Sequence, residues 1–525
     1  MKSFFGTTIT IATVCIMFVV LVLGVRGLPG NVNIGEMNWK TWIEDGPFET
    51  SSDRARFVLT YSFIEEQSTI FSLDAARFAV PDLGMSSSGD YVSLFAPGVS
   101  FLVIPGYIVG KFFGASQAGT YAVIMLFAFL NALLLRAIAI RLGAHPIASH
   151  MGALAFLFAS PAFAYAVALY QHHVSLFLIL ASLYIAMRWK GVLPAMAVLF
   201  LYGVGFVVDN PNAILMLPIL LYTAGQFIYI AHKQTSSYIT IRFVGALALA
   251  GVILPLIFFA WFNNASYGAA FSLPGTFERV VAIDEFGYPT ESDITKAQGL
   301  SDAEISGKKD EKSVVGFFKT RNLLNGFYIH LISPDRGMIN FAPVLFLGIV
   351  GLFILYRRQK SIARVLVGIC GLTFILYSLW GDPWGGWAFG SRYLIPIYAI
   401  LGIGVAVALT RFRKNYIFVI LFLALFSYSV WVNVSGAITT NLNPPQVEVL
   451  ALEEVFGTEI KYTHQKNFDA LKDNKSKSFV FQTVAKRYMS AATYHRVLVG
   501  ILIAVMLLSM LYLLFVKRVE IYDEH

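Results

Sequence analysis

Apolar runs of roughly 20 residues recur along nearly the whole chain and alternate with polar segments. An α-helix rises about 1.5 Å per residue, so a run of this length crosses a hydrocarbon core of about 30 Å. This criterion predicts about twelve membrane-spanning helices, at residues 6–25, 116–140, 147–168, 174–189, 192–208, 212–231, 239–262, 338–357, 361–380, 392–410, 415–433 and 496–516. The predicted fold class is an all-α polytopic membrane protein with a large first external loop and interfacial helices.

The first apolar run follows Lys2 and resembles both a signal peptide and a membrane span. A signal peptide has a short apolar core and ends in a small-x-small cleavage site. Here the core is longer, and Gly24-Val25-Arg26-Gly27 lacks such a site. We therefore predict an uncleaved first span.

The segment from Leu94 to Phe113 decides the topology, because it is apolar but interrupted by prolines and glycines at 97, 98, 105, 106 and 110. Short cytoplasmic connections carry an excess of Lys and Arg. If this segment does not span, the basic residues beside the spans all fall on the cytoplasmic side: Arg136, Arg141, Arg188, Lys190, Lys233, Arg242, Arg357, Arg358, Lys360, Arg411, Arg413, Lys414, Lys517 and Arg518. We expect an interfacial or re-entrant helix over 94–113, with both termini in the cytoplasm.

This topology places three hydrophilic stretches outside, at 26–93, 263–337 and 434–495. We predict a transmembrane catalytic region over 1–433, with external loops 26–93 and 263–337. An external C-terminal segment (434–495) and a last helix with a cytoplasmic tail (496–525) follow. Residues 302–312 are rich in charge and are interpreted as a solvated loop tip.

Composition narrows the function classes. The chain is 57% hydrophobic with 13% charged residues, and its mean hydropathy is +0.68. The net charge of +8 comes mainly from residues beside the spans, where they set topology and contact anionic lipids, so nucleic-acid binding is not expected. Cys15 and Cys370 lie within predicted spans, which argues against a disulfide, and no Cys/His spacing predicts a metal site.

Ten of the acidic residues fall between Arg26 and Tyr91. Among them, Asp53 begins a helical-looking stretch in Ser51-Ser-Asp-Arg-Ala-Arg-Phe57. A carboxylate there can take the proton of an acceptor hydroxyl, a role worth about 10²- to 10⁴-fold in rate. The alternative is a helix N-cap, because Ser52 and Asp53 are both strong capping types.

Further polar residues come out at external ends of spans. Arg392 follows a turn rich in Trp and Gly, and its guanidinium can hold a phosphate with two parallel hydrogen bonds; a snorkelling anchor is the alternative. Arg336 in Ser-Pro-Asp-Arg-Gly is a second candidate for the phosphate, and the alternative is a surface pair with Asp335 or a simple turn. His172 and His173 are candidates for binding a sugar or phosphate; the alternative is a capped helix end with ordinary interfacial histidines. Asp209 and Asn210 precede Pro211, a pattern that first indicates a turn at the start of a helix. Contact with the substrate is the second interpretation.

Several motifs together resemble the GT-C superfamily of membrane glycosyltransferases that use polyprenyl-phosphate sugars. The resemblance covers nearly the whole chain and rests on a first span, an acidic external loop, an interfacial Pro/Gly helix and a helical bundle. The motifs that carry it are residues 91–102, 169–173, 208–212, 261–268, 333–337 and 384–393. The superfamily includes the protein O-mannosyltransferases and the aminoarabinose transferase of lipid A. It also has many prokaryotic members, so the resemblance implies a location in a prokaryotic cell membrane.

In that family an acid in the first external loop acts as the base, and the matching position is Asp53. Arg54 stands where several branches have a second acid, so Asp45 and Asp90 remain rivals and the need for a divalent cation stays open. The resemblance implies an inverting transferase on the outer face, which takes a sugar from a polyprenyl-phosphate donor to an acceptor hydroxyl on a glycan, lipid or protein. Arg392 and Arg336 are not universal in the family.

Two function classes compete with this prediction. A transporter or flippase of a lipid-linked or small polar substrate would place ionisable groups near the membrane midplane, whereas the predicted spans contain few. A non-catalytic scaffold that binds partners through the three external segments is the third alternative. The sequence leaves open the sugar, the acceptor and the polyprenol length.

Overall fold

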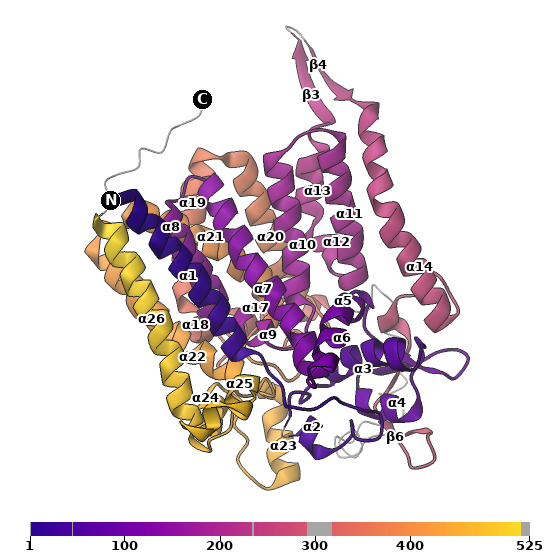
Figure 1. The fold of residues 1–525 in the computed structure, drawn as a ribbon. Helices are drawn as coiled ribbons and strands as arrows, with labels where there is room; N and C mark the ends of the chain where they lie inside the picture. Colours follow the sequence, from indigo (N-terminus) through magenta and orange to yellow (C-terminus); the bar gives the residue numbers. More distant parts are fainter. Residues whose placement is uncertain (1, 45, 234–235, 291–317, 516–525) are drawn as a thin grey trace.

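The computed structural model describes residues 2–44, 46–233, 236–290 and 318–515, and its fold is an all-α polytopic membrane fold. Most helices run between two opposite ends of one bundle (Figure 1). Within the described residues, seven helices are long and apolar enough to cross a membrane. They are α1 (Lys2–Gly24), α7 (Ser116–Arg141), η1 with α14 (Phe243–Val252, Ile253–Tyr267), α20 (Lys360–Ser378), η5 with α21 (Arg392–Leu394, Ile395–Phe412), α22 (Tyr416–Ile438) and α26 (Ala491–Phe515).

Shorter apolar helices complete the bundle, and their boundaries differ from the predicted ones. They are α8 (Pro146–Phe158), α10 (His172–Arg188), α11 (Val192–Val208), α12 (Asn212–Leu215), α13 (Leu217–Ala224), α18 (Met338–Phe341), η4 (Pro343–Phe346) and α19 (Leu347–Arg358). The helix predicted over 147–168 ends at Phe158, and α9 (Ala162–Ala166) begins only after Pro161. The helix predicted over 338–357 is broken before Pro343. In both places proline lacks the N–H that a continuous helix needs.

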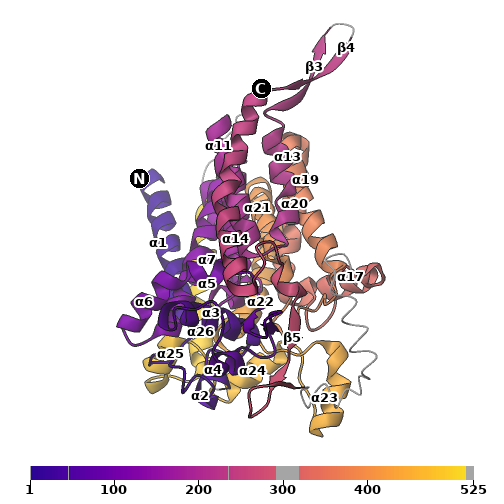
Figure 2. The ribbon, with the colours of Figure 1, turned by 90° about the vertical axis from the view of Figure 1, so that its right-hand side faces the viewer.

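A β-hairpin replaces the ends of two predicted helices. The chain leaves α13 at Ala224 and forms β3 (Ile228–Lys233), which pairs antiparallel with β4 (Ser236–Ile241). Ile and Tyr dominate both strands and favour extended backbone over helix. The predictions of helix over 225–231 and 239–241 were therefore wrong, and the hairpin projects from the end of the bundle (Figures 1 and 2).

The segment from Leu94 to Phe113 forms two short helices, α5 (Gly98–Leu102) and α6 (Ile104–Phe112). With five and nine residues they are too short to span a membrane, as predicted. Gly106 and Gly110 let α6 lie directly on α7, because a Cβ at either position would collide with the backbone beside Gly119.

The polar segments gather at one end of the bundle, called here the loop end (Figures 1 and 2). A three-stranded sheet of order β2-β1-β5 joins the first segment to residues after α14. The loop end contains α2 (Lys40–Ile43), α3 (Ser51–Glu65), α4 (Leu73–Ala79), β1 (Leu83–Met85), β2 (Tyr91–Ser93), η2 (Pro274–Thr276), β5 (Glu278–Val280), β6 (Ala282–Ile283), β7 (Pro289–Thr290), η3 (Thr320–Asn322), α17 (Leu323–Leu331), η6 (Gln446–Glu448), α23 (Val449–Phe456), α24 (Gln465–Lys472), α25 (Phe479–Thr483) and η7 (Ala485–Arg487).

The opposite end is called the basic end. It holds the connections 142–145, 189–191, 225–227, 242, 359 and 413–415 and the strands β3 and β4. α1 begins there and α26 ends there, since a Cβ at Gly6 would meet the Tyr512 ring. The structure therefore separates the loop end, where the described candidate residues lie, from an end whose connections at 189–191, 242 and 413–415 carry Lys or Arg.

A buried ion network ties the first loop to the segment before α26. Glu49 Oε1 lies 2.6 Å from Arg26 Nη1, and Glu49 Oε2 lies 3.0 Å from Lys477 Nζ. Arg26 also donates to Gly436 O, and Asn441 N donates to Glu49. Burial alone would raise the pKa of Glu49, but Lys477 and Arg26 outweigh it and hold that pKa at about 2. The C-terminal segment is thus joined to the wall of the site by buried charges.

Candidate active site

Asp53 lies in the first turn of α3 and is completely buried. Its Oδ2 accepts the Thr50 hydroxyl at 2.8 Å, and its Oδ1 accepts the backbone N–H of Leu169 at 3.0 Å. Thr50 is the N-cap of the helix, so the capping role considered for Ser52 and Asp53 belongs to a neighbour. Burial raises the pKa of Asp53 from 3.8 to about 6, although the Thr50 hydroxyl, Arg26 and Arg56 act in the opposite direction. Such a carboxyl changes charge close to neutral pH, which suits a general base.

Two arginines share one aromatic ring beside Asp53. The guanidinium carbon of Arg392 lies 5.1 Å from the centre of the Tyr170 ring, and that of Arg56 lies 5.6 Å from it. Arg56 also stacks at 4.0 Å over Phe95 and donates to Gln171 Oε1 at 2.6 Å. We call Arg56 and Arg392 the arginine pair. Like charges repel when they are held together out of water, so an anion between them would be strongly attracted.

The glycine turn before Arg392 sets the position of that side chain. Gly385, Gly386 and Gly390 have φ values of +72°, +64° and +61°, which L side chains rarely adopt. A Cβ at Gly385 would lie 3.1 Å from Arg392 Nε, a contact tighter than nearly all real ones. Arg392 Nε is buried and has no hydrogen-bond partner. A buried donor without a partner marks a place where a ligand can bind.

Asp209 faces the same arginines from the end of α11. It is the C-cap of this helix, just outside the apolar run. Burial raises the pKa of Asp209 to about 6. The positive charges of Arg56 and Arg392 and a hydrogen bond with Gln171 act in the opposite direction. The structure thus places a second titratable carboxyl beside the arginine pair.

The histidines divide into two kinds. His172 stacks on Tyr170 with ring centres 5.8 Å apart, meets Tyr393 edge-on, and its buried Nε2 has no partner. His173 instead bonds Ala162 O at 2.8 Å and packs within the bundle. His172 therefore belongs to one cluster with Tyr170, Asp53, Asp209 and the arginine pair, and His173 has a structural role.

Arg336 is also completely buried, but its donors are used by the protein itself. It donates to the backbone oxygens of Trp384, Asp335, Gly386 and Asn443 at 2.8 to 3.0 Å. These bonds fasten the glycine turn to the C-terminal segment. The phosphate-binding role of Arg336 stays a prediction, and this arrangement favours a structural role.

Neither of the two acids that rival Asp53 as the base is seen in this cluster. Asp45 lies outside the residues that the structure describes. Asp90 lies at the β1–β2 turn, where its carboxylate accepts the Ser88 hydroxyl at 2.6 Å. Among the described residues, no three His, Cys, Asp or Glu side chains gather as a metal ion requires. A divalent cation stays an untested prediction.

Sequence reasoning missed Arg56, Tyr170 and Gln171 as members of the site. Arg54 and Arg56 are two residues apart, but only Arg56 lies over the Tyr170 ring, while Arg54 donates to the backbone oxygens of Phe78 and Val80. A signal was available, because residues three apart lie on one helix face and Arg56 is three residues after Asp53.

No protein-family model matches the chain, and no curated protein matches it. Among solved structures, ArnT from Cupriavidus metallidurans in the apo state is similar, with 13% identity, a TM-score of 0.44, and coverage of 97% of this chain and 77% of that chain. The structure of the same protein bound to undecaprenyl phosphate has 13% identity and a TM-score of 0.46, and the match covers 97% of this chain and 76% of that chain. The archaeal oligosaccharyltransferase AglB from Archaeoglobus fulgidus, in complex with an inhibitory peptide and a dolichol-phosphate, is also similar. It has 15% identity and a TM-score of 0.40, and the match covers 94% of this chain and 56% of that chain.

Proposed function

We propose that the protein is an inverting membrane glycosyltransferase that moves a sugar from a polyprenyl-phosphate donor to an acceptor hydroxyl on the external face of the membrane. The observation that carries this proposal is the arginine pair on Tyr170, with Asp53 beside it. One part of the cluster suits a phosphate, and the other suits a hydroxyl proton. The setting, at the loop end of an apolar bundle, lets a polyprenyl tail stay in hydrocarbon.

In the proposed reaction, Asp53 takes the proton of the acceptor hydroxyl. The acceptor oxygen attacks the anomeric carbon as the bond from that carbon to the phosphate oxygen breaks. The leaving group is polyprenyl monophosphate, and Arg392 and Arg56 offset the charge that develops on it. Such electrostatic stabilisation is often the largest contribution to catalysis.

Asp53 is fully buried, so an acceptor reaches it only after the loop end moves. The same burial keeps water from the anomeric carbon, where hydrolysis would compete with transfer. On the positive-inside argument, the loop end faces outward and both termini face the cytoplasm.

Binding of the leaving product tests the phosphate part of this proposal. The thermal stability of the purified protein in detergent would be measured with a short polyprenyl monophosphate. At about a hundred times its dissociation constant, such a ligand adds roughly 2.7 kcal/mol. We expect stabilisation in the wild type and in Arg411→Ala, a control at the basic end, and its loss in Arg392→Ala. No stabilisation of the wild type would instead favour the transporter class.

Catalysis is tested by the release of polyprenyl monophosphate from a panel of polyprenyl-phosphate hexoses and pentoses in liposomes. A mixture of glycan, lipid and peptide acceptors is supplied with each donor. The monophosphate forms with whichever of them is used, so the acceptor need not be identified first. We expect release with at least one sugar. If none of the donors releases polyprenyl monophosphate although the monophosphate itself binds, the protein is a lipid-phosphate binder without this activity.

A further inference from the structure

A cavity of about 570 Å³ opens at the basic end, on the far side of the bundle from the arginine pair. The α10–α11 connection contributes Lys190 and Gly191. The end of α13 and the residues after it contribute Leu221, Tyr222 and Gln226, and the start of α20 contributes Ser361. Arg242, just after β4, closes another side. Four separate segments therefore build this cavity.

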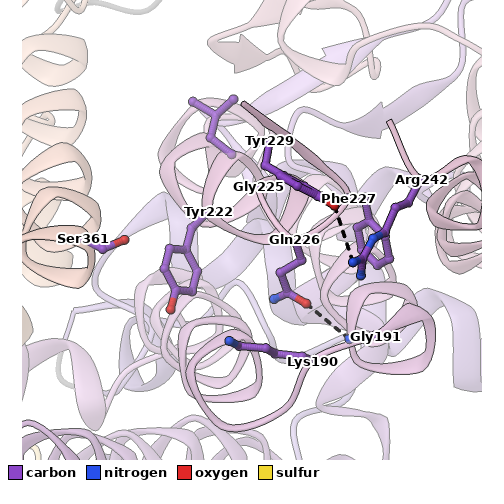
Figure 3. Close-up of a pocket in the computed structure, with 10 residues that line it drawn as sticks. Lys190, Gly191, Tyr222, Gly225, Gln226, Phe227, Tyr229, Arg242 and Ser361 are labelled. Atoms are coloured by element: carbon purple, nitrogen blue, oxygen red, sulfur yellow. Dashed lines mark hydrogen bonds between the residues drawn. The ribbon is translucent and has the colours of Figure 1, made fainter. Parts of the chain in front are cut away.

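Polar groups of the lining converge in Figure 3. The ammonium of Lys190, the side-chain amide of Gln226 and the hydroxyl of Tyr222 point toward one another. Gln226 is held in place because its Oε1 accepts the Gly191 N–H at 3.2 Å, which leaves its amide NH₂ as a donor. Three donors from two segments thus face one space.

The charge of the cavity has one sign. Among the described residues that line it, Lys190 and Arg242 are the only cations and none is an acid. Neither forms an ion pair within the described part of the chain; Arg242 instead lies 5.4 Å over the Tyr229 ring, and its Nη2 is 3.5 Å from the Tyr229 hydroxyl. The neighbouring stretches 136–150, 184–195, 221–246, 354–364 and 408–419 contain no Asp or Glu. A phosphate would meet no repelling carboxylate among them.

Exposed apolar side chains accompany the polar lining. Leu221, which lines the cavity, is 73% exposed, and Phe243, the residue after Arg242 in the chain, is 81% exposed. On a membrane protein, apolar side chains at this position face acyl chains. A ligand that fits both parts has an anionic head beside Lys190 and Arg242 and a hydrocarbon tail along α13 and η1.

We propose that this cavity binds the headgroup of an anionic phospholipid at the inner leaflet. The occupant is distinct from the polyprenyl donor, because the cavity and the arginine pair lie at opposite ends of the bundle. Its function would be to hold the β3–β4 hairpin against the bundle, since Tyr229 and Arg242 come from the base of that hairpin. The proposal does not depend on the glycosyltransferase assignment.

The test is the affinity of the full-length protein for phosphatidylglycerol in detergent micelles, followed by native mass spectrometry. Each cation beside an anionic headgroup is worth about fivefold in affinity, so Lys190→Gln/Arg242→Gln should bind roughly 25-fold more weakly. The matched control Arg411→Gln/Lys414→Gln removes the same charge from the basic end and should bind as the wild type does. The exchange Lys190→Arg/Arg242→Lys keeps both charges and should also bind, which separates charge loss from misfolding.

Three outcomes would overturn the proposal. Equal weakening in the two Gln double variants would mean that the lipid follows the general charge of the basic end. Equal affinity for phosphatidylcholine would remove the role of the anionic head. Equal affinity for inorganic phosphate would mean that the ligand is a soluble phosphate compound and not a lipid.

Discussion

Replacing Asp53 by Asn should make the protein less active and, at alkaline pH, more stable. Both effects follow from the burial of a carboxyl whose pKa is raised to about 6. If Asp53 is the base, Asp53→Asn loses about 10²- to 10⁴-fold in rate. In the wild type, about one tenth of Asp53 is ionised at pH 5, so the rate should fall about tenfold between pH 7 and pH 5.

The stability change has a definite sign. The native protein binds this proton more tightly than the unfolded chain, where the pKa is 3.8. Native stability therefore falls as pH rises from 3.8 through 6, by about 3 kcal/mol in total, because one pKa unit is worth about 1.36 kcal/mol. Asn carries no charge, so Asp53→Asn avoids this loss. Its amide NH₂ can donate to Thr50 Oγ1, and its oxygen can keep the Leu169 N–H.

The assay pairs release of polyprenyl monophosphate between pH 5 and 8 with thermal unfolding at pH 4, 6 and 8. We expect the stability advantage of Asp53→Asn to be small at pH 4 and largest at pH 8. Asp82→Asn is the control, because Asp82 accepts the Ser51 hydroxyl at the start of the same helix but pairs with Arg279. Unchanged release in Asp53→Asn would show that Asp53 is not the base. Lower stability at pH 8 would show that its carboxylate is a structural anchor.

Three further perturbations test the phosphate site, the ion network and the helix packing. Arg392→Lys keeps the charge but not the planar fork, so polyprenyl monophosphate should bind at least about tenfold more weakly in a titration followed by thermal shift; equal binding would refute the fork. Glu49→Gln leaves Arg26 buried without its partner and should lower the free energy of unfolding by about 3 kcal/mol or more at pH 7. Because the pKa of Glu49 is held at about 2, the wild type keeps this advantage above pH 4.5 and loses it as pH falls toward 2. Gly351→Val forces a side chain into the backbone of α21 and should abolish a monodisperse gel-filtration peak, whereas Gly500→Ala faces open space and should not.

The hydrophobic pattern predicted the course of the helices well, because hydrocarbon requires long runs without charge. The charge of the connections led to the prediction that Leu94 to Phe113 does not span, and this segment forms two helices that are each too short to do so. The pattern failed where an apolar segment is not helical. Residues 228–231 and 239–241 are apolar enough to extend two helices, but they belong to strands β3 and β4. Hydropathy measures transfer into lipid and carries little information about backbone conformation.

The candidate site was predictable only in part. Asp53 came from a family motif, and Arg392 was marked by the glycines before it, three of which have positive φ values in the structure. Arg56 and Arg336 show the limit, because both are buried arginines in polar segments and only their partners distinguish them. Arg336 meets four backbone oxygens, while Arg56 meets aromatic faces and Gln171. Which groups surround a side chain is set by contacts between distant segments, and one sequence does not contain that information in readable form.

The cluster also implies a competition between its own acids and the phosphate. Asp209 is held beside Arg56 and Arg392, so an entering phosphate meets guanidiniums that a carboxylate already partly neutralises. Removing that charge in Asp209→Asn should tighten binding of polyprenyl monophosphate at pH 8 by about fivefold, the effect of roughly 1 kcal/mol. Near pH 5, where Asp209 of the wild type is mostly protonated, the two proteins should bind alike. Tighter product binding slows release, so the variant should have a lower kcat if product release limits the rate. Weaker binding of the monophosphate by Asp209→Asn at pH 8 would instead show that Asp209 positions the arginines, and that its charge is part of the phosphate site's support.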